Sequence, residues 1–242
     1  MLETFAELGV NTQPQFWISV LEIIWINVLL SGDNALVIAM VCRGLPGKQR
    51  MMGMVLGTGV ALGLRLVFTG VVATLMLLPF IKIAGGFALL WIAYKLLAPN
   101  EESGHGHGET DGLWHAVKLI ALADVVMSLD NVIAVAAAAH GNFALLIFGL
   151  GVCVPAIVAG ASLFMAMINY FPLTIWAGAA LLGWIAGDIV ATDPIIAERT
   201  HMLGASAAKT IEFTMAALGV IGVLAAGLIA RSRQMRQHAL DL

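Results

Sequence analysis

Long apolar runs separated by short polar breaks dominate the pattern along this chain. Seven of them have about the length that a helix needs to cross the hydrocarbon core of a membrane, roughly 20 residues. They cover 16–42, 52–78, 81–98, 113–139, 143–168, 173–192 and 211–230. The breaks carry turn-forming residues such as Pro46, Pro99 and Pro172. The pattern therefore predicts seven transmembrane helices in a single transmembrane domain, 1–242.

The chain also carries an internal repeat. Segment 30–44, LSGDNALVIAMVCRG, matches segment 127–141, MSLDNVIAVAAAAHG, in a shared Ser-x-Asp-Asn core and a closing glycine. Segment 84–93, AGGFALLWIA, likewise matches segment 177–186, AGAALLGWIA. Similarity between apolar segments is common by chance, but the shared Ser-x-Asp-Asn is polar. We therefore expect the first three spans to recur as spans four to six.

Three spans per repeat is an odd number, so the second copy should cross the membrane in the opposite direction. This predicts a first inverted repeat at 16–98, a cytoplasmic linker at 99–112, a second inverted repeat at 113–192 and a seventh helix at 211–230. The expected fold class is an all-α membrane protein with seven transmembrane helices, two inverted three-helix repeats plus one extra C-terminal helix. This plan is typical of secondary transporters, whose sites lie near the membrane midplane between the repeats.

Basic residues set the expected orientation, because short cytoplasmic loops are enriched in Lys and Arg. With seven spans, the first loop and the C-terminal tail lie on the same side, and both are basic. Their charges are Arg43, Lys48, Arg50, Arg231, Arg233 and Arg236. We expect a multi-pass protein of the cell membrane with its N-terminus outside and its C-terminus in the cytoplasm.

Composition narrows the class further. The chain is 60% apolar and only 11% charged, whereas a soluble domain carries about 25% charged residues. This excludes a soluble enzyme, a nucleic-acid binder and a disordered chain. A net charge of −3 offers no basic face to a polyanion, and the chain contains no CxxC motif for thiol–disulfide chemistry.

Two carboxylates lie in the middle of apolar runs, Asp33 and Asp130, each followed by a carboxamide, Asn34 or Asn131. An ionised Asp at a helix centre costs roughly 2.5–3.5 kcal/mol on insertion scales, so both need a compensating partner. Two carboxylates neutralise one divalent cation, and carboxamide oxygens complete the oxygen-rich shell that Mg²⁺, Ca²⁺ or Mn²⁺ prefers. The simpler alternative is a polar cluster that only forms hydrogen bonds between helices.

Four further polar residues in the spans are candidate coupling or accessory residues. Glu22 precedes Asp33 by 11 residues, so the two can share a helix face. Asp124 is the repeat partner of Asn27. A buried acid near a cation site is a natural proton carrier, which makes Glu22 and Asp124 candidates for that role. Arg65, in the middle of the second span, should pair with one of these acids.

Local features predict where helices distort or pack closely. Spans one and four should be interrupted or distorted near Asp33 and Asp130. The Gly-xxx-Gly steps predict close helix contacts; they are Gly53/Gly57, Gly59/Gly63 and Gly183/Gly187. In the linker, His105 and His107 beside acidic residues could bind metal weakly, but a plain solvated linker is the favoured interpretation.

With Ser-Gly-Asp-Asn and Ser-Leu-Asp-Asn motifs in two inverted halves, the sequence resembles the TerC family of integral membrane proteins over about residues 15–230. It is most similar to the YjbE-type metal transporters of the wider LysE superfamily. The resemblance implies efflux of divalent metal, chiefly Mn²⁺, and in some members supply of metal to exported proteins. It places the acidic metal-site positions on Asp33 and Asp130, with Asn34 and Asn131 beside them. Two aspartates would repel tellurite, an oxyanion, as a direct substrate.

We therefore expect a secondary active exporter of a divalent metal cation, with Mn²⁺ as the cargo, with no enzymatic activity and no resident cofactor. Expected partners are the metal ion and the lipid bilayer, with a homo-oligomer or exported metalloproteins as further candidates and no nucleic acid. One alternative is an intramembrane aspartyl protease with Asp33 and Asp130 as its dyad, but no Gly-x-Gly-Asp sequence is present. Another is a non-transporting assembly subunit for exported metalloproteins.

Overall fold

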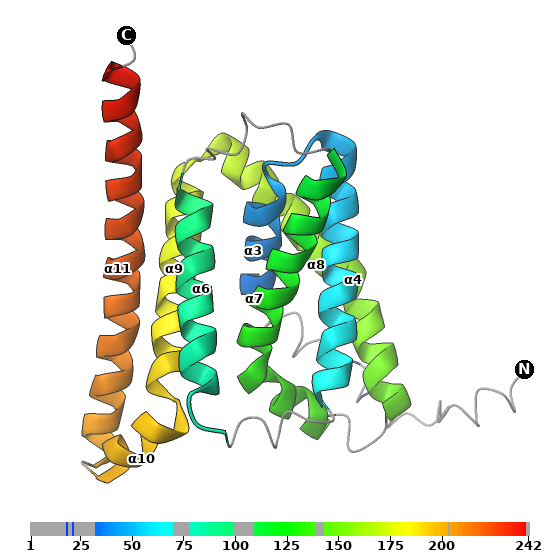
Figure 1. Ribbon diagram of the computed structural model, residues 1–242. Coiled ribbons are helices and arrows are strands. Elements are labelled where there is room, and N and C mark those ends of the chain that lie inside the picture. Colours follow the sequence, from blue (N-terminus) through cyan, green and yellow to red (C-terminus); the bar gives the residue numbers. More distant parts are fainter. Residues whose placement is uncertain are drawn as a thin grey trace, which may run out of the picture. The chain divides into compact units, whose positions relative to one another are not determined.

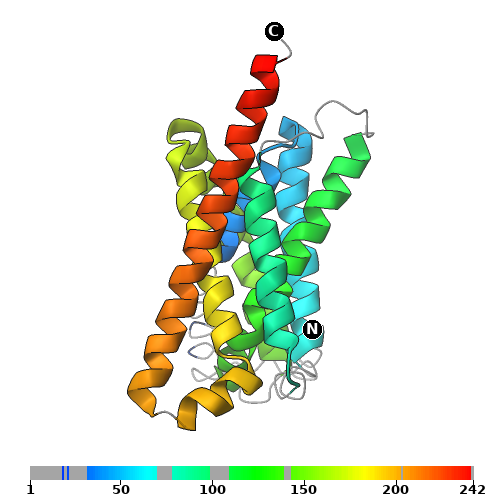
Figure 2. The ribbon, with the colours of Figure 1, turned by 60° about the vertical axis from the view of Figure 1, so that its left-hand side comes forward.

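The computed structural model describes residues 18, 21, 32–69, 78–98, 109–138, 143–202 and 204–240 (Figures 1 and 2). Within these ranges the chain forms eight helices and no strand. The helices are α3 (Gly32–Cys42), α4 (Gly47–Thr69), α6 (Ile81–Leu97), α7 (Glu109–Ala138), α8 (Phe143–Tyr170), α9 (Leu173–Ala191), α10 (Pro194–Met202) and α11 (Ala205–Leu240).

The length and composition of these helices match a membrane environment. Among the described residues, four segments are long and apolar enough to cross a bilayer: Gly47–Val67, Cys153–Tyr170, Leu173–Ala191 and Ala205–Arg233. Large apolar side chains such as Leu163, Phe213 and Ile221 are exposed on them, as expected where lipid replaces water. The chain is an all-α membrane protein, and the count of seven spans stays a prediction.

The helices belong to two compact units that each combine distant parts of the sequence. Unit 1 consists of Met1–Thr74 and Ala116–Met165, and therefore contains α3, α4 and most of α7 and α8. Unit 2 consists of Leu75–His115 and Ala166–Leu242, and contains α6, α9, α10 and α11.

In unit 2, α9 packs along both α6 and α11 (Figures 1 and 2). Glycines permit the close approach of α9 to α11. A Cβ atom on Gly183 would lie 2.7 Å from the carbonyl oxygen of Gly219, and one on Gly187 would collide with the carbonyl oxygen of Met215. The expected close contact at the Gly183/Gly187 step is confirmed.

The glycine steps of α4 behave differently from one another. A Cβ atom on Gly57 would lie 2.6 Å from the Cδ1 atom of Ile120 on α7, so this residue permits a close helix contact in unit 1. Gly59 and Gly63 are exposed, and no atom of the described residues lies within 4 Å of a Cβ atom on either. Within the described part of the chain, the predicted contact at this second step is therefore not formed.

A buried carboxylate joins the start of α6 to the start of α10 in unit 2. Asp193 is fully buried, and its Oδ1 atom accepts hydrogen bonds from the backbone N–H groups of Phe80 (3.3 Å) and Ile195 (3.1 Å). Its Oδ2 atom accepts one from the N–H of Ile83 at 3.3 Å. Phe80 has φ 70°, the left-handed conformation that a non-glycine residue rarely adopts. Asp193 thus satisfies donors at two helix N-termini.

The helices that carry the two Asp-Asn motifs differ from expectation at one point. α3 begins at Gly32, directly before Asp33, and residues 22–31 before it lie outside the described part of the chain. α7 continues as an α-helix through Asp130 to Ala138. Of the expected interruption or distortion near Asp130, the interruption is therefore absent, whereas Figure 1 shows α7 bending towards its C-terminal end.

Candidate functional site

Three polar side chains form a closed hydrogen-bonded ring in the interior of unit 1. The Nη2 atom of Arg65 on α4 donates to Oδ1 of Asp124 on α7 at 2.6 Å, and their side chains are only 2% and 10% exposed. The Nε atom of Arg65 donates to the hydroxyl oxygen of Ser128 at 3.0 Å. That hydroxyl in turn donates to Oδ2 of Asp124 at 3.2 Å. The prediction that Arg65 pairs with a membrane acid is confirmed, and the acid is Asp124.

Local helix geometry explains how this ring forms. Asp124 and Ser128 lie four residues apart on one helix, so their side chains share a face of α7. Gly57 on α4 leaves room for Ile120, one turn before Asp124, and this lets α4 and α7 approach closely. Removing two charges from water is costly unless they pair and are hydrogen-bonded, so the ring requires this close approach.

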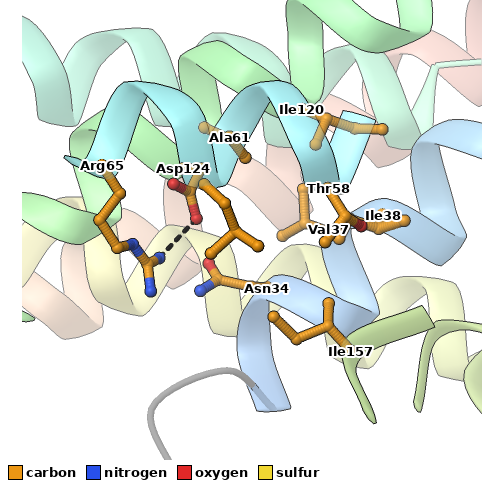
Figure 3. Close-up of a pocket in the computed structure, with 11 residues that line it drawn as sticks. Asn34, Val37, Ile38, Thr58, Ala61, Arg65, Ile120, Asp124 and Ile157 are labelled. Atoms are coloured by element: carbon orange, nitrogen blue, oxygen red, sulfur yellow. Dashed lines mark hydrogen bonds and ion pairs between the residues drawn. The ribbon is translucent and has the colours of Figure 1, made fainter. Parts of the chain in front are cut away.

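A small cavity of about 20 Å³ adjoins the Arg65–Asp124 pair. Its polar lining is Asn34, Thr58, Arg65 and Asp124, and the other lining residues are apolar. Figure 3 shows the carboxamide of Asn34 turned towards the Arg65–Asp124 pair. A cavity that holds one water molecule needs at least roughly 10–15 Å³. The space therefore suits a single water molecule or a cation that has lost most of its hydration shell.

The first Asp-Asn motif lies at the N-terminal end of α3, next to this cavity. The Oδ1 atom of Asp33 accepts a hydrogen bond from the backbone N–H of Asn34 at 2.8 Å. Asp33 is half-buried and lies within electrostatic range of Arg65 and Asp124. The N-terminus of a helix favours negative charge. Asp33, Arg65 and Asp124 together carry a formal charge of −1, so this part of the site attracts a cation.

The remaining sequence-predicted residues lie elsewhere or outside the described structure. Asp130 and Asn131 belong to α7, but their side chains are not among those described. Glu22, Asn27 and the linker histidines, His105 and His107, lie outside the described residues. The structure thus brings together Asp33, Asn34, Arg65 and Asp124.

One further residue of the cavity lining, Thr58, and one buried residue in electrostatic range of Arg65, Cys153, become visible only in the structure. Thr58 is 1% exposed, lines the cavity, and donates its hydroxyl to the carbonyl oxygen of Met54 at 2.7 Å. Its position seven residues before Arg65, on the same face of α4, was the available sequence signal. Cys153 of α8 is buried within electrostatic range of Arg65. Among the described side chains, no three His, Cys, Asp or Glu residues gather into a metal-binding cluster.

Comparisons with known proteins place the chain in a family. The model of the integral membrane protein TerC family matches residues 12–235. The chain is 43% identical over 181 residues to the uncharacterized membrane protein YjbE of Bacillus subtilis (strain 168), a match that covers 75% of this chain and 83% of YjbE. No solved structure matches the chain significantly.

Two other relatives differ in how much of their length is matched. The uncharacterized membrane protein YceF of Bacillus subtilis (strain 168) is 30% identical over 187 residues, which are 73% of this chain and 72% of YceF. The UPF0053 inner membrane protein YoaE of Escherichia coli (strain K12) is 30% identical over 140 residues, 50% of this chain and 27% of YoaE. Since the family model covers nearly the whole chain and YjbE is similar over most of its length, this protein belongs to the TerC family of integral membrane proteins.

Proposed function

We propose that this protein is a secondary active exporter of a divalent metal cation, with Mn²⁺ as its cargo, in the cell membrane. The observation that carries the proposal is the cavity in unit 1, where Asn34 and Asp124 line a space beside Asp33 within an apolar helix bundle. Membership of the TerC family supports a membrane function of this kind.

The chemistry of the lining supports a hard cation. The cavity presents a carboxylate from Asp124, a carboxamide from Asn34 and a hydroxyl from Thr58, and oxygen ligands suit Mn²⁺, Mg²⁺ and Ca²⁺. Because Arg65 offsets one of the two described acids, a divalent ion needs a further negative charge. We assign this charge to Asp130, with Asn131 beside it, as the resemblance implies.

The composition of the two units supports the proposed inverted repeats, 16–98 and 113–192. Unit 1 combines the first two expected spans of each repeat, and unit 2 combines the third span of each with the extra seventh helix. The two third spans, α6 and α9, are repeat equivalents and pack against each other: a Cβ atom on Gly86 would lie 2.7 Å from the carbonyl oxygen of Ala186. When two repeats interlock about a pseudo-two-fold axis, each compact unit is expected to contain helices from both repeats.

The proposed orientation, N-terminus outside and C-terminus cytoplasmic, makes transport an energy-requiring export. Moving cations out against the inside-negative potential costs about 2.3 kcal/mol per charge per 100 mV, so a second ion must drive it. We propose proton antiport, with Glu22 and Asp124 as the candidate carriers. If flux by the reconstituted protein neither moves protons nor responds to a pH gradient, this coupling is wrong.

The test is Mn²⁺ flux into proteoliposomes that contain the purified protein and a trapped Mn²⁺-sensitive dye. Asp33→Asn and Asp130→Asn are nearly isosteric and remove only charge, so each variant should fold normally and lose flux. Asp188→Asn, at an acid of α9 in unit 2, is the matched control and should keep most flux.

The possible outcomes distinguish a wrong function from a wrong assignment of one metal ligand. Wild-type protein that is folded and reconstituted but moves no divalent metal contradicts the proposed function. Wild-type flux in Asp33→Asn or Asp130→Asn would instead remove that residue from the metal site and leave the function standing.

A further inference from the structure

We propose that Arg65 is a tethered counter-ion that competes with the transported cation for the carboxylate of Asp124. The inference rests on the proposed function and specifies what occupies the same site when no metal is bound. In the empty site Arg65 holds Asp124; when the cation enters, the guanidinium gives up the carboxylate and the cation takes its place.

Hydrogen bonds already use both carboxylate oxygens of Asp124. Arg65 Nη2 contacts Oδ1 at 2.6 Å, and the hydroxyl of Ser128 contacts Oδ2 at 3.2 Å. The Arg65 Nε–H bond to Ser128 at 3.0 Å holds the guanidinium in this position. A cation that uses a carboxylate oxygen of Asp124 must therefore displace or share one of these contacts.

The cavity lies directly beside the Arg65–Asp124 pair. Arg65 and Asp124 both line it, together with Asn34 and Thr58. A divalent ion in this space would sit beside the positive guanidinium, and like charges repel strongly in an interior that screens them poorly. Movement of Arg65 away from the cavity relieves this repulsion and frees Asp124 in one step.

An empty carrier also needs a counter-charge. A secondary transporter must complete part of its cycle without cargo, and an uncompensated buried carboxylate is costly at that stage. With Arg65 neutralising Asp124 on this step, the antiported proton is carried by Glu22, the other candidate carrier. Asp33 also lies within electrostatic range of Arg65 and Asp124, so an empty site without Arg65 would hold at least two unneutralised acids. A tethered cation neutralises one of them without leaving the protein.

A purely structural ion pair is the competing explanation, and the two differ in their effect on metal affinity. The experiment measures the Mn²⁺ concentration at half-maximal flux, KM, and the maximal flux per folded molecule for four proteins: wild type, Arg65→Gln, Asp124→Asn and the double variant. Arg65→Gln should lower KM, because the competitor is gone, and should also lower maximal flux. If Arg65 holds Asp124 about nine-tenths of the time, KM falls about tenfold.

The double variant tests whether the effect acts through Asp124. In the Asp124→Asn background, Arg65→Gln should lower KM much less than in the wild-type background, because no carboxylate is left to compete for and only the charge repulsion is removed. An equal fall in KM in both backgrounds would mean that Arg65 merely repels the cation, which overturns the proposal. An unchanged or raised KM in folded Arg65→Gln would also overturn it.

Ser128→Ala keeps every charge and provides a second test if Arg65→Gln fails to fold. Loss of the Nε anchor should loosen the guanidinium and lower KM, by less than Arg65→Gln would. A raised KM would identify Ser128 as a metal ligand, an unchanged KM would identify the ring as structural, and either result overturns the exchange. If the wild-type protein transports Mn²⁺ but Ser128→Ala raises KM or leaves it unchanged, the exchange at Asp124 is contradicted and the proposed function still stands. Wild-type protein without metal flux contradicts the proposed function itself.

Discussion

Gly219 on α11 offers a sharp test of how unit 2 is held together. A Cβ atom there would collide with the carbonyl oxygen of Gly183 on α9 and lie 3.0 Å from its carbonyl carbon. These are main-chain atoms, so no side-chain rotation can make room. Gly219→Ala should therefore push α11 away from α9 and lower the stability of the protein.

Gly222, three residues later on the same helix, is the matched control, since none of the described residues lies within 4 Å of a Cβ atom at that position. Both Gly→Ala changes gain about 1 kcal/mol of helix propensity, so this contribution cancels when the two variants are compared. Overpacking a close contact costs roughly 1–3 kcal/mol. We expect Gly219→Ala to be less stable than Gly222→Ala by that amount.

The assay is thermal unfolding of both purified variants in the same detergent. For a chain of this size, 1 kcal/mol shifts Tm by about 2–4 °C, so the two Tm values should differ by about 2–12 °C. Equal Tm values, or a higher Tm for Gly219→Ala, would show that α9 and α11 are not in main-chain contact. Gly219→Leu against Gly222→Leu repeats the comparison with a larger side chain and should widen the difference.

Three further changes probe other parts of the molecule. Asp193→Ala leaves buried N–H donors without an acceptor, so it should lower the free energy of unfolding by about 3 kcal/mol. The flux per folded molecule should not change, and an unaltered Tm would contradict the expected loss of stability. Thr58→Val removes the hydroxyl from the cavity and should therefore raise the KM for Mn²⁺. The Tm should stay nearly constant, because that hydroxyl only donates to a helical carbonyl. A KM equal to that of the wild type would exclude Thr58 as a ligand. His105→Ala combined with His107→Ala should leave most Mn²⁺ flux intact, and a large loss would assign the linker a metal-handling role.

The membrane class and most helix positions were predictable because they depend on local properties. A long apolar run must form a helix in lipid, where every backbone polar group needs an internal partner. The run at 173–192 corresponds to α9 (Leu173–Ala191), and that at 81–98 to α6 (Ile81–Leu97). The seventh run, 211–230, lies inside the longer α11 (Ala205–Leu240), since polar helix ends outside the hydrocarbon carry no apolar signal. The short helix α10 was missed for the same reason.

The sequence predicted that Arg65 pairs with an acid in the membrane, but not which acid. An Arg in the middle of an apolar span requires an acidic partner, and the sequence alone left Glu22 and Asp124 as alternatives. The choice of Asp124 depends on how closely α4 and α7 approach, which Gly57 and Ile120 decide through a contact between distant parts of the chain.

Identical local motifs also had different outcomes in the folded chain. Gly183/Gly187 and Gly59/Gly63 are the same four-residue step, yet among the described helices only the first of these two steps meets a neighbour. Asp193, which lies between the predicted spans 173–192 and 211–230, is a fully buried acceptor for two helix N-termini. The sequence by itself determines that these segments are helical and apolar, because lipid imposes that locally. Only the tertiary structure decides which face of each helix meets another, because burial and charge pairing depend on atoms from distant parts of the chain.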